Sequence, residues 1–167
     1  LPSKKAETAW VLYQLTGDVR SLEEVYPALS RYLDWRIKNP RWIYLGMTPE
    51  NEKDIEFVVA GLIDIKCMAQ IADVLGKKVD AGDWKNKYQS LFSQCLNWFW
   101  DSPQTLPVQH LNQFKGRDTF PVQITTGLYL DELSDDYYES MLGLFYKYYD
   151  TEQPFAGFDA AKYPDMN

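Results

Sequence analysis

Residues 71–78 read Ile-Ala-Asp-Val-Leu-Gly-Lys-Lys, a stretch that ends one apolar segment and introduces another. The same arrangement surrounds Leu15-Thr16-Gly17-Asp18 and Leu130-Asp131-Glu132-Leu133, so the three leucines lie 60 and 55 residues apart (75 − 15 and 130 − 75). Each second segment closes on aromatic residues: Trp35, then Trp98 and Trp100, then Tyr148 and Tyr149. A near-fixed long period is typical of stacked helical hairpins, because a single hairpin cannot bury its apolar face alone. The sequence therefore predicts an all-α fold of about three hairpins.

Helical periodicity places the first two segments. Residues 4–15 form the first predicted helix, which ends at Gly17, a residue suited to the left-handed position after a helix. The second segment contains Ser21-Leu22-Glu23-Glu24, a capping-box pattern, and ends at Asn39-Pro40. Because proline inside a helix costs roughly 3 kcal/mol, we expect a short capped turn followed by a main helix with Pro27 in its first turn. One stripe of this segment carries Leu22, Val25, Tyr26, Leu29, Leu33 and Arg36.

The later segments alternate between inner and outer types. Residues 54–75 are apolar nearly all round and belong inside the fold, whereas residues 82–99 carry a one-sided aromatic stripe and form an outer helix. Residues 121–130 make a short fifth segment, and Ser134 caps a sixth of the outer type.

Composition restricts the possible functions. The 167 residues are 46% hydrophobic, enough for one domain spanning residues 1–167. A net charge of −7 argues against a nucleic-acid partner and favours a neutral or cationic ligand. No apolar run is long enough to span a membrane. One histidine and two separated cysteines are too few to form a zinc site of the usual ligand types, so we expect no metal site. The sequence contains neither a phosphate-loop motif nor a dinucleotide-binding motif, so we expect no cofactor. Cys67 and Cys95 lie among apolar residues and are expected to be buried free thiols.

Two stretches without helical periodicity, residues 40–53 and 101–120, hold most of the polar candidates. Long loops in a compact domain are usually functional or disordered. Flat aromatic rings with polar edges suit carbohydrate, although in a helical repeat they also serve as hairpin packing. The candidates for sugar stacking are Trp42, Tyr44, Trp100 and Phe114.

Inner helices alternating with outer ones, aspartate-rich turns and long aromatic loops resemble the catalytic (α/α)6 toroid of the six-hairpin glycosidases. The nearest likeness is to the family of processing α-glucosidase I and its bacterial relatives. The residues that carry the resemblance are Ala9-Trp10-Val11-Leu12-Tyr13 with Thr16-Gly17-Asp18, Val25-Tyr26-Pro27-Ala28-Leu29 with Tyr32-Leu33-Asp34-Trp35, Lys53-Asp54-Ile55-Glu56-Phe57 with Leu62-Ile63-Asp64, and Ala72-Asp73-Val74-Leu75-Gly76.

The resemblance implies hydrolysis of a glycosidic bond by two carboxylates. In enzymes that invert the configuration of the anomeric carbon, these carboxylates are about 6.5 to 9.5 Å apart. The family's acid follows an outer helix, which places its counterpart among Glu50, Glu52 and Asp54, although the usual Glu-Ser-x-x-Asp pattern is absent. Helix capping is the alternative role for Asp54, since negative charge is favoured at a helix start. Asp64 faces either a sugar cavity, as a substrate-binding residue, or a neighbouring helix or loop that satisfies it.

The family's base lies beyond the counterpart of Asn167, so we expect the chain to be one part of a glycoside hydrolase domain and inactive alone. Its partners would be carbohydrate and the remainder of a parent chain. A partial ring also predicts an exposed apolar edge, around residues 55–75 or the first segment, that self-association would cover. The competing hypothesis is a non-enzymatic α-helical repeat that binds protein or glycan.

Overall fold

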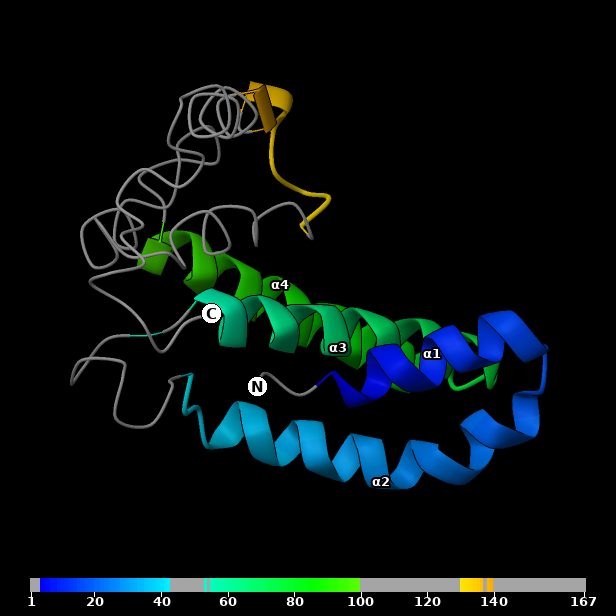
Figure 1. Ribbon diagram of the computed structural model, residues 1–167. Helices are drawn as coiled ribbons and strands as arrows, with labels where there is room; N and C mark the ends of the chain where they lie inside the picture. Colours follow the sequence, from blue (N-terminus) through cyan, green and yellow to red (C-terminus); the bar gives the residue numbers. More distant parts are fainter. Residues whose placement is uncertain (1–3, 43–52, 54, 100–129, 137, 140–167) are drawn as a thin grey trace, which may run out of the picture. The chain divides into compact units, whose positions relative to one another are not determined.

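The first hairpin joins two helices, α1 (Lys5–Thr16) and α2 (Val19–Lys38), through a tight turn at Gly17 (Figure 1). The computed structural model describes residues 4–42, 53, 55–99, 130–136 and 138–139. Gly17 has a φ of +69°, and its N–H donates to the carbonyl of Tyr13 at 2.7 Å, the bond that closes a helix with a left-handed residue. The predicted end of the first helix is confirmed.

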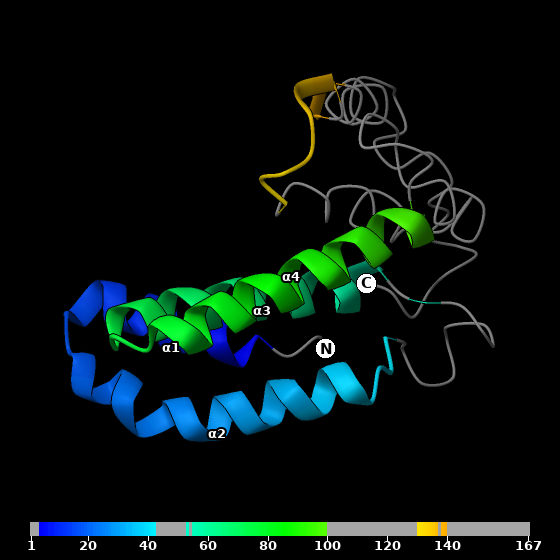
Figure 2. The same ribbon diagram turned by 180° about the vertical axis from the view of Figure 1, so that it is seen from behind.

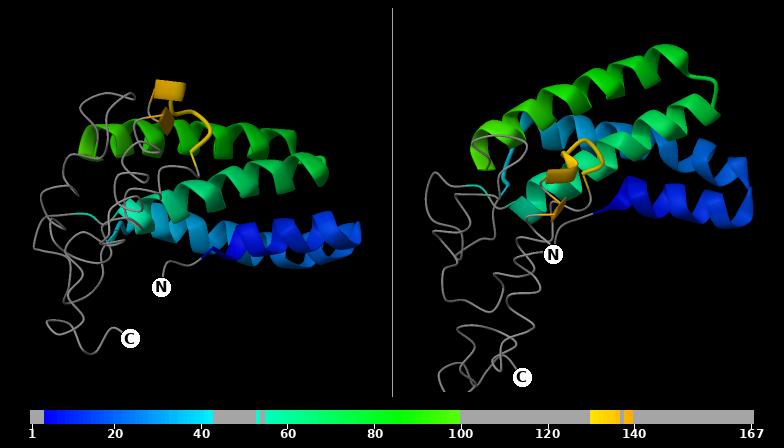
Figure 3. Two further views of the ribbon diagram at one scale, coloured as in Figure 1. Left: turned by 45° about the horizontal axis from the view of Figure 1, so that its top comes forward. Right: turned by 90° about the horizontal axis from the view of Figure 1, so that it is seen from above.

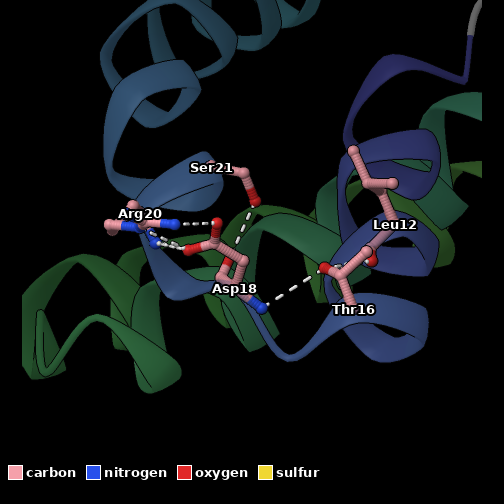
Figure 4. Close-up of polar contacts among 5 residues, drawn as sticks. All are labelled: Leu12, Thr16, Asp18, Arg20 and Ser21. Atoms are coloured by element: carbon pink, nitrogen blue, oxygen red, sulfur yellow. Dashed lines mark hydrogen bonds and ion pairs between the residues drawn. The ribbon is translucent and has the colours of Figure 1, made fainter.

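The start of α2 differs from the prediction. Its N-cap is Asp18, whose carboxylate accepts the backbone N–H of Arg20 at 3.1 Å and two guanidinium hydrogen bonds at 2.9 and 2.8 Å (Figure 4). The Ser21 hydroxyl donates to the Asp18 carbonyl instead of capping a helix of its own. The predicted capping box and separate short turn are therefore wrong: α2 runs continuously through Pro27. Asn39 ends it, as the sequence predicts.

The second hairpin joins α3 (Ile55–Val74) to α4 (Lys78–Phe99) through Gly76. Gly76 has a φ of +71°, its N–H donates to the carbonyl of Asp73, and the N–H of Lys77 donates to the carbonyl of Ala72. This pair of bonds is a Schellman motif, which supplies partners for the last carbonyls of α3. α4 begins four residues before the predicted start at Gly82.

The turns at Gly17 and Gly76 lie at the same end of the two hairpins (Figures 1 and 2). The last residue of α2 and the first residue of α3 lie at the opposite end. α1 and α2 both pack against α3, which lies between α1 and α4 (Figure 3). Most side chains of α3 are accordingly buried, as its nearly uniform apolar sequence predicts, although Gln70 and Val74 are exposed. The largest fully buried ones are Ile55, Leu62, Ile65, Met68 and Ile71.

A polar cluster joins α2 to α4. The Tyr26 hydroxyl donates to Asp80 at 2.9 Å and accepts the indole N–H of Trp84 at 3.3 Å. Closer to the C-terminal end of α2, the ammonium of Lys87 pairs with Asp34 at 2.6 Å. The bonds of Tyr26 and Trp84 satisfy buried polar groups that would otherwise oppose packing of the two helices.

The fold is all-α and made of helical hairpins, and the part of the chain that the structure describes contains no strand. It divides into two compact units, Leu1–Cys95 and Leu96–Asn167. In the second unit the predicted turn is present: the N–H of Leu133 donates to the carbonyl of Leu130 at 3.2 Å, and helical residues follow Ser134. Among the described helices none is long and apolar enough to cross a membrane.

Candidate functional site

The predicted catalytic residues belong to the connection between α2 and α3. Trp42, just after α2, and Lys53, just before α3, are the described residues that flank it, at the end opposite the Gly17 and Gly76 turns. Glu50, Glu52, Asp54, Tyr44, Trp100 and Phe114 all lie outside the described residues. Their proposed roles stay predictions.

Trp42 is a buried residue, with 2% of its side chain exposed. Its six-membered ring lies over Gly61 of α3 so closely that a Cβ added there would come 2.8 Å from its Cζ3 atom. The absence of a side chain at Gly61 therefore allows the Trp42 indole to pack directly against the backbone of α3. A sugar can stack on this ring only after the ring is uncovered, so the position serves packing in this conformation.

The surroundings of Trp42 include a hydrogen-bond donor without an acceptor among the described residues and a positively charged side chain. Its indole N–H is buried and has no acceptor among the residues that the structure describes. The guanidinium carbon of Arg36 lies 4.6 Å from the centre of the Trp42 ring and 5.8 Å from that of Phe57. A cation over aromatic faces is stabilised by the ring quadrupoles, and more strongly where water is excluded. Arg36 and Trp42 thus bring hydrogen-bond donors to the end of the hairpin pair near the predicted acids.

Asp64 caps a neighbouring helix. It lies on α3 with 1% of its side chain exposed, and its two carboxylate oxygens accept the backbone N–H groups of Lys5 at 3.1 Å and Glu7 at 3.0 Å. Those groups belong to the first turn of α1, where Lys4 at the N-cap makes no side-chain cap bond. Of the two roles considered for Asp64, the structure shows a buried aspartate satisfied by a neighbouring helix.

Burial raises the pKa of Asp64 to about 6, because desolvation penalises the charged carboxylate. The backbone N–H groups of Glu7, Lys5 and Ala6 act in the opposite direction and favour the ionised form, while the charge of Glu7 adds to the rise. A carboxyl with a pKa near neutrality is suited to proton transfer. In Asp64, however, both carboxylate oxygens already accept hydrogen bonds from backbone amides of α1. The raised pKa is therefore a consequence of packing α1 against α3 and not a sign of a catalytic group.

The remaining titratable groups of the described chain do not assemble a metal site. No group of three or more histidine, cysteine, aspartate or glutamate side chains in residues 4–42, 53, 55–99, 130–136 and 138–139 is placed to hold an ion. Cys67 and Cys95 are free and buried, as predicted. Burial raises the pKa of Cys67 to about 12 and that of Cys95 still further, so neither thiol is a nucleophile in the folded protein.

Arg36 and Gly61 are the residues that sequence reasoning did not single out as part of this site. The signal for Arg36 was present, because it is the one charged member of the apolar stripe of α2. Gly61 has no comparable signal beyond being a glycine within an apolar helix.

Comparisons with known proteins found no matching family model, no matching curated protein and no matching solved structure.

Proposed function

We propose that this chain forms part of the catalytic domain of a glycoside hydrolase that acts on a glucoside or a related oligosaccharide. The arrangement of the first unit supports the proposal. Tight turns occupy one end of the hairpins, and the acid-bearing connection between Trp42 and Lys53 starts and finishes at the other. In helical toroids the active-site loops share one end in the same manner, as the resemblance implies.

The observation that carries the proposal is the buried indole N–H of Trp42 beside Arg36, which has no acceptor among the described residues. An unpaired buried donor costs about 1–3 kcal/mol, so its presence calls for an acceptor. A sugar is rich in hydroxyl oxygens that accept hydrogen bonds from a guanidinium, and from the indole N–H once Trp42 is uncovered. The same ligand offers apolar ring faces to the aromatic residues of the connection.

The proposed reaction uses two carboxyl groups. One protonates the leaving glycosidic oxygen while the other activates water, and the acid must have a raised pKa to hold its proton. Glu50, Glu52 and Asp54 are the candidates for the acid on this chain, and the base belongs to a part of the parent protein outside it. The isolated chain is therefore expected to be inactive.

The test measures hydrolysis of a panel of glucosides and oligosaccharides by the intact gene product that contains this chain. Glu50→Gln, Glu52→Gln and Asp54→Asn are made singly, with Glu23→Gln on the exposed face of α2 as the matched control. We expect one of the three to lower kcat by about 10²- to 10⁴-fold and the control to leave it unchanged. Full activity in all three variants, or no activity in the parent, contradicts the proposal.

A non-enzymatic helical repeat that binds protein or glycan is the second candidate. It is favoured by the packing role of Trp42 and the capping role of Asp64, two predicted ligand-binding residues that serve the fold. Titration calorimetry of the parent protein with oligosaccharides distinguishes the two functions. Saturable binding without any hydrolysis supports the binding module.

A further inference from the structure

The outward side of α2 carries an exposed tryptophan between two basic side chains. Trp35 is 59% exposed, and Arg31 and Lys38 are exposed as well. At about 100° and 1.5 Å per residue, the three residues lie within about 60° of one another around the helix. Along its axis Trp35 is about 6 Å from Arg31 and about 4.5 Å from Lys38. They therefore form one line, the Arg31–Trp35–Lys38 stripe.

The cations of this stripe have no acidic partner among the residues that the structure describes. Neither Arg31 nor Lys38 takes part in an ion pair there. The nearest acid along the helix, Asp34, is held by the ammonium of Lys87 at 2.6 Å. Glu24 lies on the same side of α2 but about 10 Å from Arg31 along the axis. The stripe is therefore a local excess of positive charge on a protein whose net charge is −7.

Helix stability explains only part of this arrangement. Lys38 is in the last turn of α2, where the helix dipole favours a cation. Arg31 lies about two turns before the helix end, beyond the reach of that effect. The Trp35 ring contacts no other aromatic ring and no cation in the described part of the chain. Neither Arg31 nor Trp35 thus has a side-chain partner within the described fold.

A membrane surface and a protein surface match the stripe poorly. The apolar side of α2, which includes Leu22, Leu29 and Leu33, is buried in the fold and is not available for insertion into a membrane. Protein interfaces of standard size bury about 800 Å² on each side around an apolar centre. The stripe offers a single large apolar side chain in a narrow line. A thin, linear ligand fits it better than a broad surface does.

A linear anionic ligand with flat rings matches both kinds of side chain. The indole of Trp35 provides a stacking surface for a sugar ring, and the cations on either side pair with carboxylates of the neighbouring sugars. Single-stranded nucleic acid shares these features, but its affinity comes from neutralising many phosphates. The stripe has two cations on a chain of net charge −7, so a ligand with fewer charges suits it better. The distant acids repel such a ligand little, because salt screens them beyond about 8 Å.

We propose that the Arg31–Trp35–Lys38 stripe binds an acidic polysaccharide in which charged and neutral sugars alternate. A neutral ring stacks on Trp35, and the carboxylates before and after it pair with Arg31 and Lys38. The stripe runs toward the end of α2 from which the acid-bearing connection starts, so a bound chain extends toward that connection (Figure 1). The inference rests on the proposed function only for the carbohydrate nature of the ligand.

An NMR titration of the full chain tests the proposal with a short oligosaccharide of alternating glucuronate and N-acetylglucosamine. The indole N–H signal of Trp35, identified by its loss in Trp35→Leu, should shift saturably with a dissociation constant of about 0.1–1 mM. Added salt should weaken binding, because charge pairs contribute to it. Hydrolysis is not measured, so a failure of binding is distinguishable from a failure of the proposed activity.

Substitutions measure the contribution of each side chain, with the backbone amides of α2 as the readout. Trp35→Leu should raise the dissociation constant by about tenfold, whereas Trp35→Phe, which keeps an aromatic face, should raise it less. Arg31→Gln and Lys38→Gln should each raise it by about 2- to 5-fold. Lys78→Gln is the matched control and should leave it unchanged, since Lys78 is exposed on α4 and pairs with Asp73.

Other ligands test the two parts of the assignment. A neutral N-acetylglucosamine oligomer of equal length should bind several-fold more weakly, and equal binding contradicts the role of the cations. An oligoglutamate or an oligothymidylate that binds as tightly as the acidic oligosaccharide contradicts the assignment to a sugar. The absence of a saturable shift of the Trp35 signal up to about 10 mM acidic oligosaccharide overturns the proposal.

Discussion

At the scale of single residues, Asp64 shows how one carboxylate is held between two opposing effects. Its burial on α3 favours the neutral form, while the α1 amides that it caps favour the charged form. Burial is the larger effect, so the pKa rises from 3.8 to about 6. The folded protein therefore binds a proton at Asp64 more tightly than the unfolded chain does.

This difference predicts a dependence of stability on pH. The stabilisation from protonated Asp64 is complete below about pH 3.8 and is lost as the pH rises through about 6. The loss is on the order of 2–3 kcal/mol in the free energy of unfolding. Urea titrations from pH 4 to pH 8 should show that Asp64→Asn removes this component, while Glu23→Gln retains it. Parallel pH profiles for wild type and Asp64→Asn contradict the assignment.

The contact between Gly61 and Trp42 leads to a second prediction at this scale. Gly61→Ala should lower the free energy of unfolding by about 1–3 kcal/mol, because the new methyl group meets the indole at 2.8 Å. Gly82→Ala is the matched control: it lies within α4 with nothing within 4 Å of an added Cβ, and should stabilise by about 0.5–1 kcal/mol. Urea denaturation measures both changes.

A double-mutant cycle separates the steric effect from other consequences of the Gly61 substitution. In a Trp42→Leu background the added methyl group no longer meets the indole, so Gly61→Ala should cost less than in the wild type. Equal costs in the two backgrounds would show that the destabilisation has another origin.

At the scale of elements, the helix ends were predictable where a single local signal decides them. Gly17 and Asn39 end α1 and α2 as the sequence predicts. The start of α2 was not predictable from Ser21, because Asp18 offers a competing cap that also pairs with Arg20. α4 begins before Gly82 because its first turn is supported by tertiary contacts, including Tyr26 to Asp80.

Pro27 is the element-scale exception that yields a prediction. It lies inside α2, where it lacks the N–H that would donate to the carbonyl four residues earlier. Pro27→Ala should raise the free energy of unfolding by about 1–3 kcal/mol, measured by urea denaturation. Pro40→Ala, outside the helix, should change it by less than about 1 kcal/mol, and in the opposite direction. A loss of stability in Pro27→Ala would mean that the packing of α2 requires proline at this position.

The candidate site was less predictable than the helices. Whether Asp64 faces a cavity or a helix end depends on which element docks against α3, and its partners lie 57 and 59 residues away in sequence. Local patterns carry no information on such distances. The burial of Trp42 likewise depends on an opposing glycine that only the packed hairpins bring near.

At the scale of the whole molecule, the first unit carries both thiols, and their burial turns them into reporters of its integrity. The thiolate is the reactive form, and burial raises the pKa of Cys67 to about 12. Both thiols should resist a disulfide reagent in the folded protein and become reactive in urea together with the loss of helical circular dichroism. Val79→Cys, with an exposed thiol, should react at once without denaturant. Rapid labelling of the native wild type would contradict the burial.

The cap that Asp64 provides also has a consequence for the order of events during protein synthesis. α1 leaves the ribosome before α3, and the carboxylate that satisfies its first-turn amides lies 59 residues after Lys5. At about 5–20 residues per second, translation needs roughly 3–12 s to supply it. For that interval the nascent helix has water as its cap and cannot yet dock. The face of α1 that docking buries, which includes Ala6, is then available to chaperones, and a synonymous codon change that slows translation between α2 and α3 would prolong that exposure.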